Sequence, residues 1–189
     1  LEKQEPDKAI LVLENLSHRF PYEPTVWEAL GVAYSTAKKN ALAATTFERV
    51  AYMGVEFQEN ALYAAQAYKE IEDWTSASRC FRFYLDGFPK DSNAWKELSM
   101  AERMQGHTFL ALQSYLKSLD VTSKNFSEQD AIVLGDLFLE VKNLVQADFW
   151  LSHALEKNPE SLDAHLCLLR LAYEQKLWVD VAKELTVIE

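Results

Sequence analysis

The stretch FPYEPTVWEALGVAY, residues 20–34, is echoed by FPKDSNAWKELSMAE, residues 88–102. The leading Phe-Pro pair and the Trp at the eighth position recur at the same offsets, so that Trp27 corresponds to Trp95. Each stretch reads as a helix that starts behind a proline turn. This self-similarity predicts an array of repeated units instead of one globular core.

The repeat has half the length that separates these two stretches. Ala43, Ala77 and Ala111 are evenly spaced at that shorter interval, so the intervening unit follows the same plan. The next small residue, Ala147, comes two positions late, which predicts a two-residue insertion at residues 122–127. Within a unit, apolar residues fall at i, i+3, i+4 and i+7 of one helix, as Trp27, Leu30, Gly31 and Tyr34 do. A second helix carries Ala43, Phe47 and Val50.

The unit is therefore a helical hairpin. Small residues such as Gly31 and Ala43 suit the place where two helices cross closely, and aromatic residues fill the space beside the crossing. Prolines 21, 89 and 159 lie between units, where a proline ends one helix and sets the turn into the next.

This pattern resembles the tetratricopeptide repeat family, whose signature is Trp, Leu, Gly and Tyr in the first helix and Ala, Phe or Tyr, and Ala in the second. Some units depart from the signature. Ala61 replaces the Trp in the second complete unit, Ser99 and Glu102 replace the Gly and Tyr in the third, and His165 takes the Trp place in the last.

The resemblance implies an all-α fold, a right-handed superhelical solenoid of antiparallel helix pairs. We expect a single array over residues 1–189 with six parts. They are the second helix of a preceding repeat at 1–23, repeats at 24–57, 58–91, 92–127 with its insertion and 128–161, and a truncated repeat at 162–189. The unfinished ends predict a segment of a longer superhelix, or a tail that pairs with another copy.

Across this family the first helices line a groove that commonly holds an extended peptide or a helix. By resemblance, the groove-facing places fall on Glu28, Val32, Glu59, Leu62, Gln66, Lys69, Asn93, Lys96, Met100, Arg103, Gln129, Ile132, Asp136, Leu139, Asp163, Leu166, Arg170 and Tyr173.

These places include an apolar residue in every repeat, with charged residues around it, in a chain whose 29 acidic residues exceed its 19 basic residues. One interpretation is an apolar strip that receives a partner's amphipathic or basic-apolar segment. The other is that some of these residues pack against the neighbouring hairpin, because apolar residues at helical spacing often belong to a core. One subfamily function is excluded, the grip on the C-terminal carboxylates of heat-shock chaperones. The matching places hold Glu28, Val32, Tyr63, Asn93 and Glu97, or, with the frame shifted by one repeat, Leu62, Gln66, Glu97, Gln129 and Val133. In either frame acids or apolar groups replace two or more of the required donors.

The formal net charge of −10 argues against a nucleic-acid partner, because such binding depends on Lys and Arg. It also speaks against a helical-repeat RNA binder, the third interpretation of the repeat. The sequence has no apolar run long enough for a transmembrane helix and no visible signal peptide, so we expect no insertion into a membrane. The compartment stays open, with a soluble, cytoplasmic location slightly favoured.

Nothing in the sequence points to an enzyme. It contains no Gly-rich phosphate loop, no H-E-x-x-H and no G-x-S-x-G, and we predict no catalytic residue, metal site or cofactor. Cys80 and Cys167 are interpreted as small apolar side chains. The sequence therefore predicts a protein-interaction scaffold or adaptor with a protein partner, and self-association or a spacer role in a larger protein is the alternative.

Overall fold

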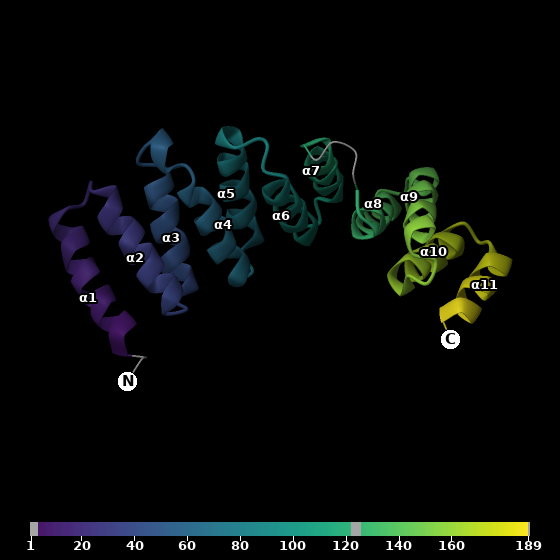
Figure 1. Cartoon of the computed structure of the whole chain (residues 1–189), viewed down its shortest axis with the longest axis horizontal. Coiled ribbons are helices and arrows are strands. Elements are labelled where there is room, and N and C mark those ends of the chain that lie inside the picture. Colours follow the sequence, from purple (N-terminus) through teal and green to yellow (C-terminus); the bar gives the residue numbers. More distant parts are fainter. Residues whose placement is uncertain (1–3, 122–125, 189) are drawn as a thin grey trace. The chain divides into compact units, whose positions relative to one another are not determined.

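The computed structural model describes residues 4–121 and 126–188, and within these ranges the chain is built from helices without a strand (Figure 1). The α-helices are α1 Gln4–Arg19, α2 Pro24–Thr36, α3 Asn40–Ala51, α4 Asn60–Glu70, α5 Trp74–Gly87, α6 Ser92–Met104, α7 Thr108–Val121, α8 Glu128–Glu140, α9 Leu144–Lys157, α10 Leu162–Glu174 and α11 Trp178–Ile188. A short 3-10 helix, η1 Val55–Phe57, lies between α3 and α4. None of the described helices combines the length and the apolar character needed to cross a bilayer.

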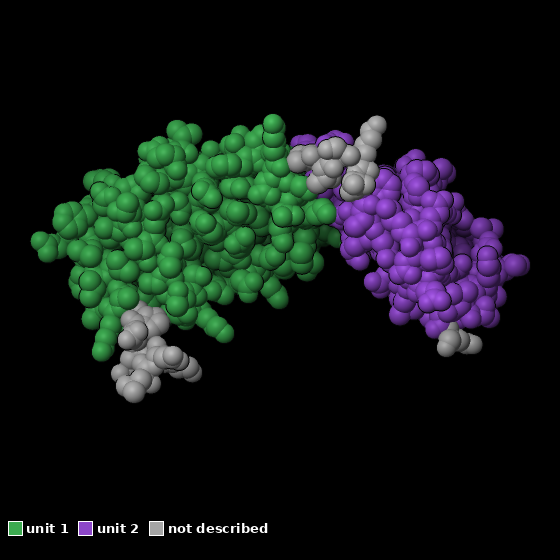
Figure 2. Space-filling model, in the orientation of Figure 1, with its two compact units in different colours: residues 1–106 green, residues 107–189 purple. Residues whose placement is uncertain are grey.

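The helices form two compact units, coloured separately in Figure 2: unit 1, residues 1–106, with α1–α6, and unit 2, residues 107–189, with α7–α11. Within each unit, every helix packs against the helix that follows it. The boundary between the units falls between the two helices of the predicted repeat 92–127.

The hairpin turns repeat with the period found in the sequence. Each hairpin turn contains one residue with a positive φ of 57–78°: Lys38, Glu72, Gly106, Lys142 and Lys176. The steps between successive members are equal except for the one from Gly106 to Lys142, which is longer by two positions. The longer step spans the segment in which the sequence predicts the two-residue insertion. Most of the predicted insertion segment, residues 122–125, lies outside the described residues.

Polar side chains fix where several helices start. Asp73 precedes α5 and accepts a hydrogen bond from the Ser76 backbone nitrogen at 3.1 Å, and Asp91 does the same for α6. Ahead of α8, Ser127 and Asp130 form a reciprocal capping box, in which each side chain accepts from the other's backbone N–H. Each cap satisfies a backbone donor that a helix start leaves free, so these boundaries follow from local sequence.

The residues at helix crossings are as small as the repeat predicts. Ala43, Ala77, Ala111 and Ala147, the recurring alanines of the second helices, are fully buried. Each unit has its own hydrophobic interior, and the unit 1 cluster runs from Ile10 on α1 to Ala101 on α6. The prediction of an all-α repeat fold is confirmed.

The place of the signature Trp has a specific structural role. The indole N–H of Trp27 donates to the carbonyl oxygen of Pro21 at 3.1 Å, and that of Trp95 donates to Pro89 at 2.9 Å. In the last repeat, His165 Nε2 lies 3.0 Å from the Pro159 carbonyl oxygen. Three rings of two types therefore tie the first helix of a hairpin to the proline turn that precedes it.

A second recurring contact joins successive hairpins in unit 1. The hydroxyl group of Tyr34 donates to Glu14 at 2.6 Å, and Tyr68, at the same place in the next repeat, donates to Glu48 at 2.6 Å. In the third repeat the donor and the acceptor exchange helices. Glu102 occupies the Tyr place and accepts a hydrogen bond from Arg82 at 2.8 Å. The carboxylate thus moves from the second helix to the first, and the contact is kept.

Candidate functional site

The clearest concave feature of unit 1 lies between α2 and α4. Two adjoining hollows, each of about 360 Å³, share a floor made of Val32, Phe47 and Tyr63. We call them together the α2–α4 groove. One half is further lined by Glu28, Glu56, Glu59 and Asn60, and the other by Ser35, Thr36, Asn40, Gln66, Ala67 and Glu70.

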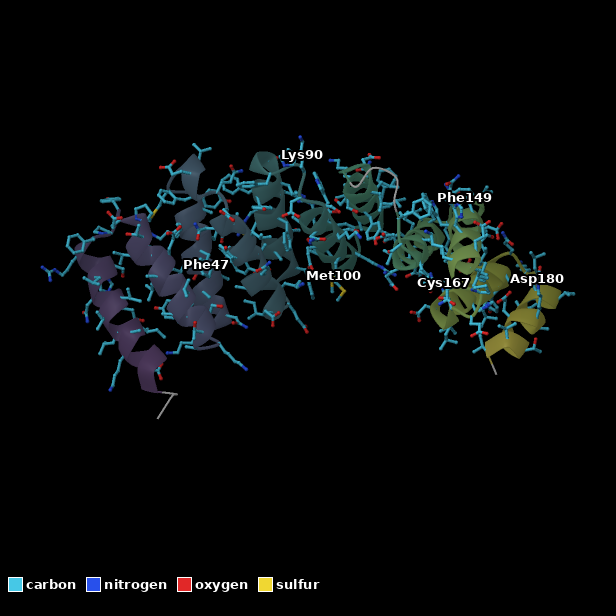
Figure 3. All side chains as sticks on the ribbon, in the orientation of Figure 1. Phe47, Lys90, Met100, Phe149, Cys167 and Asp180 are labelled. Carbon is cyan, nitrogen blue, oxygen red and sulfur yellow. The ribbon has the colours of Figure 1, made fainter. Side chains whose placement is uncertain are left out.

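The floor is apolar and in part open to solvent. Val32 is 57% exposed and Tyr63 is 47% exposed, whereas Phe47 is buried and presents only a small part of its ring. The Phe47 and Tyr63 rings lie 5.5 Å apart between centroids at a tilt of 43°. Phe47 comes from the second helix of its hairpin, α3, on which it is labelled in Figure 3.

A glycine allows Phe47 to reach this floor. A Cβ atom at Gly31 on α2 would lie 2.7 Å from Cε1 of Phe47, closer than packed carbon atoms approach. The absent side chain lets the ring pass over the α2 backbone and come close to Tyr63 on α4. A residue of the repeat signature therefore contributes directly to the groove.

In the acidic half, one carboxylate is hydrogen-bonded within the fold, and two others form no ion pair with the described residues. Glu28 accepts a hydrogen bond from Asn60 Nδ2 at 2.7 Å, so its position is fixed by α4. Asn60 also donates to the Phe57 carbonyl oxygen and thereby anchors η1, which supplies Glu56. Across the described part of the chain, no basic side chain forms an ion pair with Glu56 or Glu59.

The structure places four of the predicted groove residues in this feature: Glu28, Val32, Glu59 and Gln66. Leu62 and Lys69 lie on α4 but face other partners. Leu62 packs against the unit 1 core, and the Lys69 ammonium group pairs with Glu97 at 2.6 Å.

The predicted places on α6 lie on a different part of unit 1. Met100, labelled in Figure 3, is 47% exposed, Asn93 is also exposed, and Lys96 and Arg103 are half-buried. Neither hollow of the α2–α4 groove is lined by α6.

In unit 2, two predicted residues require correction. Ile132 and Leu139 on α8 are buried and belong to the hydrophobic interior. Helix α8 packs against α7, α9 and α10, so little of its surface stays free. The interpretation that some apolar places pack against neighbouring hairpins applies to these two residues.

The remaining unit 2 places are accessible to different degrees. Leu166 and Tyr173 on α10 are exposed, as are Gln129 and Asp163. Asp136 is half-buried and accepts from Arg170 Nη1 at 2.5 Å. A separate hollow of about 390 Å³ in unit 2 is lined by Asp148, Leu168, Leu171, Ala172, Gln175, Leu177, Asp180 and Glu184, and it contains no predicted groove residue.

Sequence reasoning left several lining residues out of the groove-facing places: Phe47 and Glu56 entirely, and Tyr63 except as a place that the chaperone-binding subfamily would use. For Phe47 the sequence indicates only packing, whereas in the structure the residue belongs to both the core and the floor. Tyr63 directly follows the predicted Leu62, so a register shifted by one position on α4 would have identified it. Glu56 belongs to η1, which no part of the repeat signature describes.

Two buried groups of unit 1, the phenol of Tyr34 and the thiol of Cys80, are held in their neutral forms by their surroundings. Burial, followed by the hydrogen bond to the Glu14 carboxylate, raises the pKa of Tyr34 to about 12. Burial is also the main cause that raises the pKa of the Cys80 thiol to about 12, so the thiol stays protonated at neutral pH. Among the described residues, no three His, Cys, Asp or Glu side chains gather as metal ligands would.

No protein-family model and no curated protein sequence matches the chain. Solved structures do match. YrrB, a TPR protein with an unusual peptide-binding site, is 11% identical, covers 93% of this chain and 90% of its own, and has a TM-score of 0.73. The MamA fragment from Desulfovibrio magneticus RS-1 is 15% identical and has a TM-score of 0.62. The match covers 82% of this chain and 87% of the MamA fragment.

A third match is the structure of Naa15/Naa10 bound to HypK-THB. It is 13% identical and has a TM-score of 0.76; the match covers 96% of this chain but only 28% of the matched chain. At these identities the likeness concerns the fold. The resemblance to tetratricopeptide repeats noted in the sequence is confirmed at that level, and the chain has a tetratricopeptide-type helical repeat fold.

Proposed function

We propose that this chain is a protein-interaction scaffold whose α2–α4 groove binds an extended peptide or a helix of a partner protein. The observation that carries the proposal is the apolar floor of Val32, Phe47 and Tyr63, which is open to solvent between two helices. An apolar side chain that covers this floor would gain about 25 cal/mol for each Å² of apolar surface removed from water.

The groove has the composition of a recognition site. Its apolar centre is flanked by polar side chains at both ends, an arrangement in which the centre provides affinity and the flanks fix orientation. The acidic residues around it favour a partner segment that is apolar and basic. The similarity to YrrB, which has a peptide-binding site, and to the Naa15/Naa10 complex supports a protein partner.

Other exposed residues of the predicted apolar strip offer further contacts for a partner within each unit. In unit 1, Met100 on α6 offers an additional apolar contact, and in unit 2, Leu166 and Tyr173 offer two on α10. The proposal assigns no role to Ile132 and Leu139, because both are buried.

Self-association is a second candidate, favoured by one observation. No described residue of α11 is buried, and the helix exposes Trp178, Val179, Leu185 and Val187. Sedimentation over a range of concentrations tests this candidate. A mass that rises with concentration for the wild type but not for Val179→Glu supports it, and a constant monomer mass contradicts it.

The groove is tested with immobilised protein and a phage library of short random peptides. Peptides retained by the wild type are then measured on Val32→Glu, which places a charge on the floor. Val12→Glu on α1 is a matched control, since Val12 is 58% exposed and lies outside the groove. The proposal predicts binding that Val32→Glu abolishes and Val12→Glu preserves. Equal binding to both variants would contradict it.

A further inference from the structure

We infer that the acidic half of the α2–α4 groove is a pocket for a basic side chain, arginine or lysine, of the bound segment. In this arrangement an apolar side chain of the same segment covers the floor at Val32 and Tyr63. The inference rests on the proposed function, because it assigns the chemistry of a segment that the groove must first bind. It adds the position of the charge within the groove.

The carboxylates that line this hollow come from three parts of the fold. Glu28 comes from α2, Glu56 from η1, and Glu59 from the residue before α4. All three line the same hollow of about 360 Å³, together with the floor residues Phe47 and Tyr63. The residues that line the two hollows of the groove include no Lys, Arg or His.

The acids of this hollow differ from the acids at the helix contacts of unit 1. Unit 1 has many carboxylates at its helix contacts, and these have partners within the chain. Glu48 accepts from Arg79 at 2.6 Å, Glu97 from Lys69 at 2.6 Å, and Glu102 from Arg82 at 2.8 Å. In the described part of the chain, Glu56 and Glu59 have no such partner, so the groove holds acids that the fold itself does not use.

The neighbouring apolar surface selects the kind of cation. A long basic side chain can lay its methylene stem on an apolar surface while its charged end stays among carboxylates and water. Tyr63 is 47% exposed, and the face of a tyrosine ring can also hold a cation. An acidic or purely apolar segment would instead bring no partner for Glu56 and Glu59.

The library selection tests this inference directly. Peptides that bind the wild type and lose binding to Val32→Glu are sequenced, and one with the common pattern is synthesised. We expect an enriched Arg or Lys near an apolar residue. The peptide is then measured on Glu56→Gln/Glu59→Gln, for which a loss of affinity of roughly threefold to tenfold is expected, since each exposed pair contributes little.

The control removes two carboxylates elsewhere. Asp86→Asn/Glu160→Gln changes the net charge equally at exposed places outside the groove, and it should leave affinity within about twofold. Replacing the basic residue of the peptide by Gln should weaken binding to the wild type but have little effect on Glu56→Gln/Glu59→Gln.

The failures of the two proposals are distinguishable. Peptides that depend on Val32 but lack basic residues, or that bind Glu56→Gln/Glu59→Gln as well as the wild type, would overturn the basic pocket and leave the groove in place. Peptides that bind Val32→Glu unchanged would overturn both.

Discussion

Gly31 on α2 lies directly against the ring of Phe47 on α3, and a Cβ at this position would come within 2.7 Å of the ring. The relationship recurs in unit 2, where a Cβ at Gly135 would lie 2.6 Å from Cδ2 of Leu151. Both pairs join the first helix of a hairpin to the second. In unit 1 the same contact also places Phe47 in the floor of the α2–α4 groove.

The first prediction concerns the sign of the effect of Gly31→Ala. In a helix interior, Ala is favoured over Gly by about 0.5–1 kcal/mol, so a mutation without steric consequence would stabilise the protein. Against the buried Phe47 ring, the added methyl group should instead cost about 1–3 kcal/mol. We therefore expect a lower free energy of unfolding in urea for Gly31→Ala.

The Phe47→Ala background controls for this contact. With the ring removed, Gly31→Ala should no longer lower the free energy of unfolding. It should raise it slightly instead, because Ala is favoured over Gly in a helix. An equal loss of stability in both backgrounds would show that the ring is not the cause.

The second prediction concerns the hairpin turns. Glu72 adopts a φ of 58°, a left-handed conformation that costs a non-glycine residue about 1–2 kcal/mol. Glu72→Gly should raise the free energy of unfolding by about 0.5–1 kcal/mol after the greater flexibility of unfolded Gly is counted. Thermal and urea denaturation measure the change. Glu72→Ala removes the same side chain without relieving the backbone and should not stabilise.

The third prediction reverses this substitution at the equivalent turn. Gly106 has a φ of 78°, and a Cβ there would meet no atom within 4 Å. Gly106→Ala should therefore lose about 1 kcal/mol through backbone strain alone. Unchanged or increased stability in denaturation would mean that strain at this turn is relieved by a local rearrangement.

The fourth prediction concerns the reversed contact of the third repeat. Arg82→Ala removes a charge-assisted hydrogen bond to Glu102, which is only 2% exposed, and should cost about 1.5–3 kcal/mol. Arg82→Glu/Glu102→Tyr would install the pair that Glu48 and Tyr68 form one repeat earlier. We expect this double variant to unfold at a higher urea concentration than Arg82→Glu alone or Glu102→Tyr alone. Additive losses would contradict the equivalence of the two contacts.

The fifth prediction concerns pH. His165 Nδ1 lies 2.6 Å from Glu184, and its Nε2 lies 3.0 Å from the Pro159 carbonyl oxygen, so both ring nitrogens can donate to these acceptors only when the imidazole is charged. Burial alone would lower the pKa of His165, but the bonds to Glu184 and Pro159 outweigh it and raise the pKa above 6.5. The stabilisation is therefore complete below the unfolded-state pKa and is lost as the pH rises through the folded-state value.

His165→Trp provides the control for this pH dependence. Trp27 and Trp95 show that an indole can make the same bond to the proline turn, and an indole does not titrate in this range. Urea unfolding from mildly acidic to mildly alkaline pH should show wild-type stability that falls relative to His165→Trp. Parallel curves would mean that the charge on His165 does not support the contact with α11.

The helical hairpins were predictable because their signals are local and periodic. The recurring alanines and the Trp, Leu, Gly and Tyr places are read within one hairpin, and they occupy the expected crossings. The burial of Ile132 and Leu139 could not be predicted in this way, because it depends on how many helices pack against α8. A side chain at a groove-facing place becomes core when a third helix covers it.

The groove was predicted only in part for a related reason. Its α2 residues follow from the repeat frame, but the floor needs Phe47 from the second helix to pass Gly31, and Glu56 comes from η1. The Gly31–Phe47 contact lies within one hairpin, but the repeat signature describes both residues only as packing places. Tyr63 of the next repeat completes the floor, and η1 has no counterpart in the signature.

The most direct test of the central claim is to locate a bound peptide by cross-linking. A peptide selected on the wild type, with a benzophenone in place of its apolar residue, is irradiated with the full chain, and the attached residues are identified by mass spectrometry. We predict attachment to α2 and α4, at or next to Val32 and Tyr63. Attachment confined to α11 or to another surface would contradict binding in the α2–α4 groove.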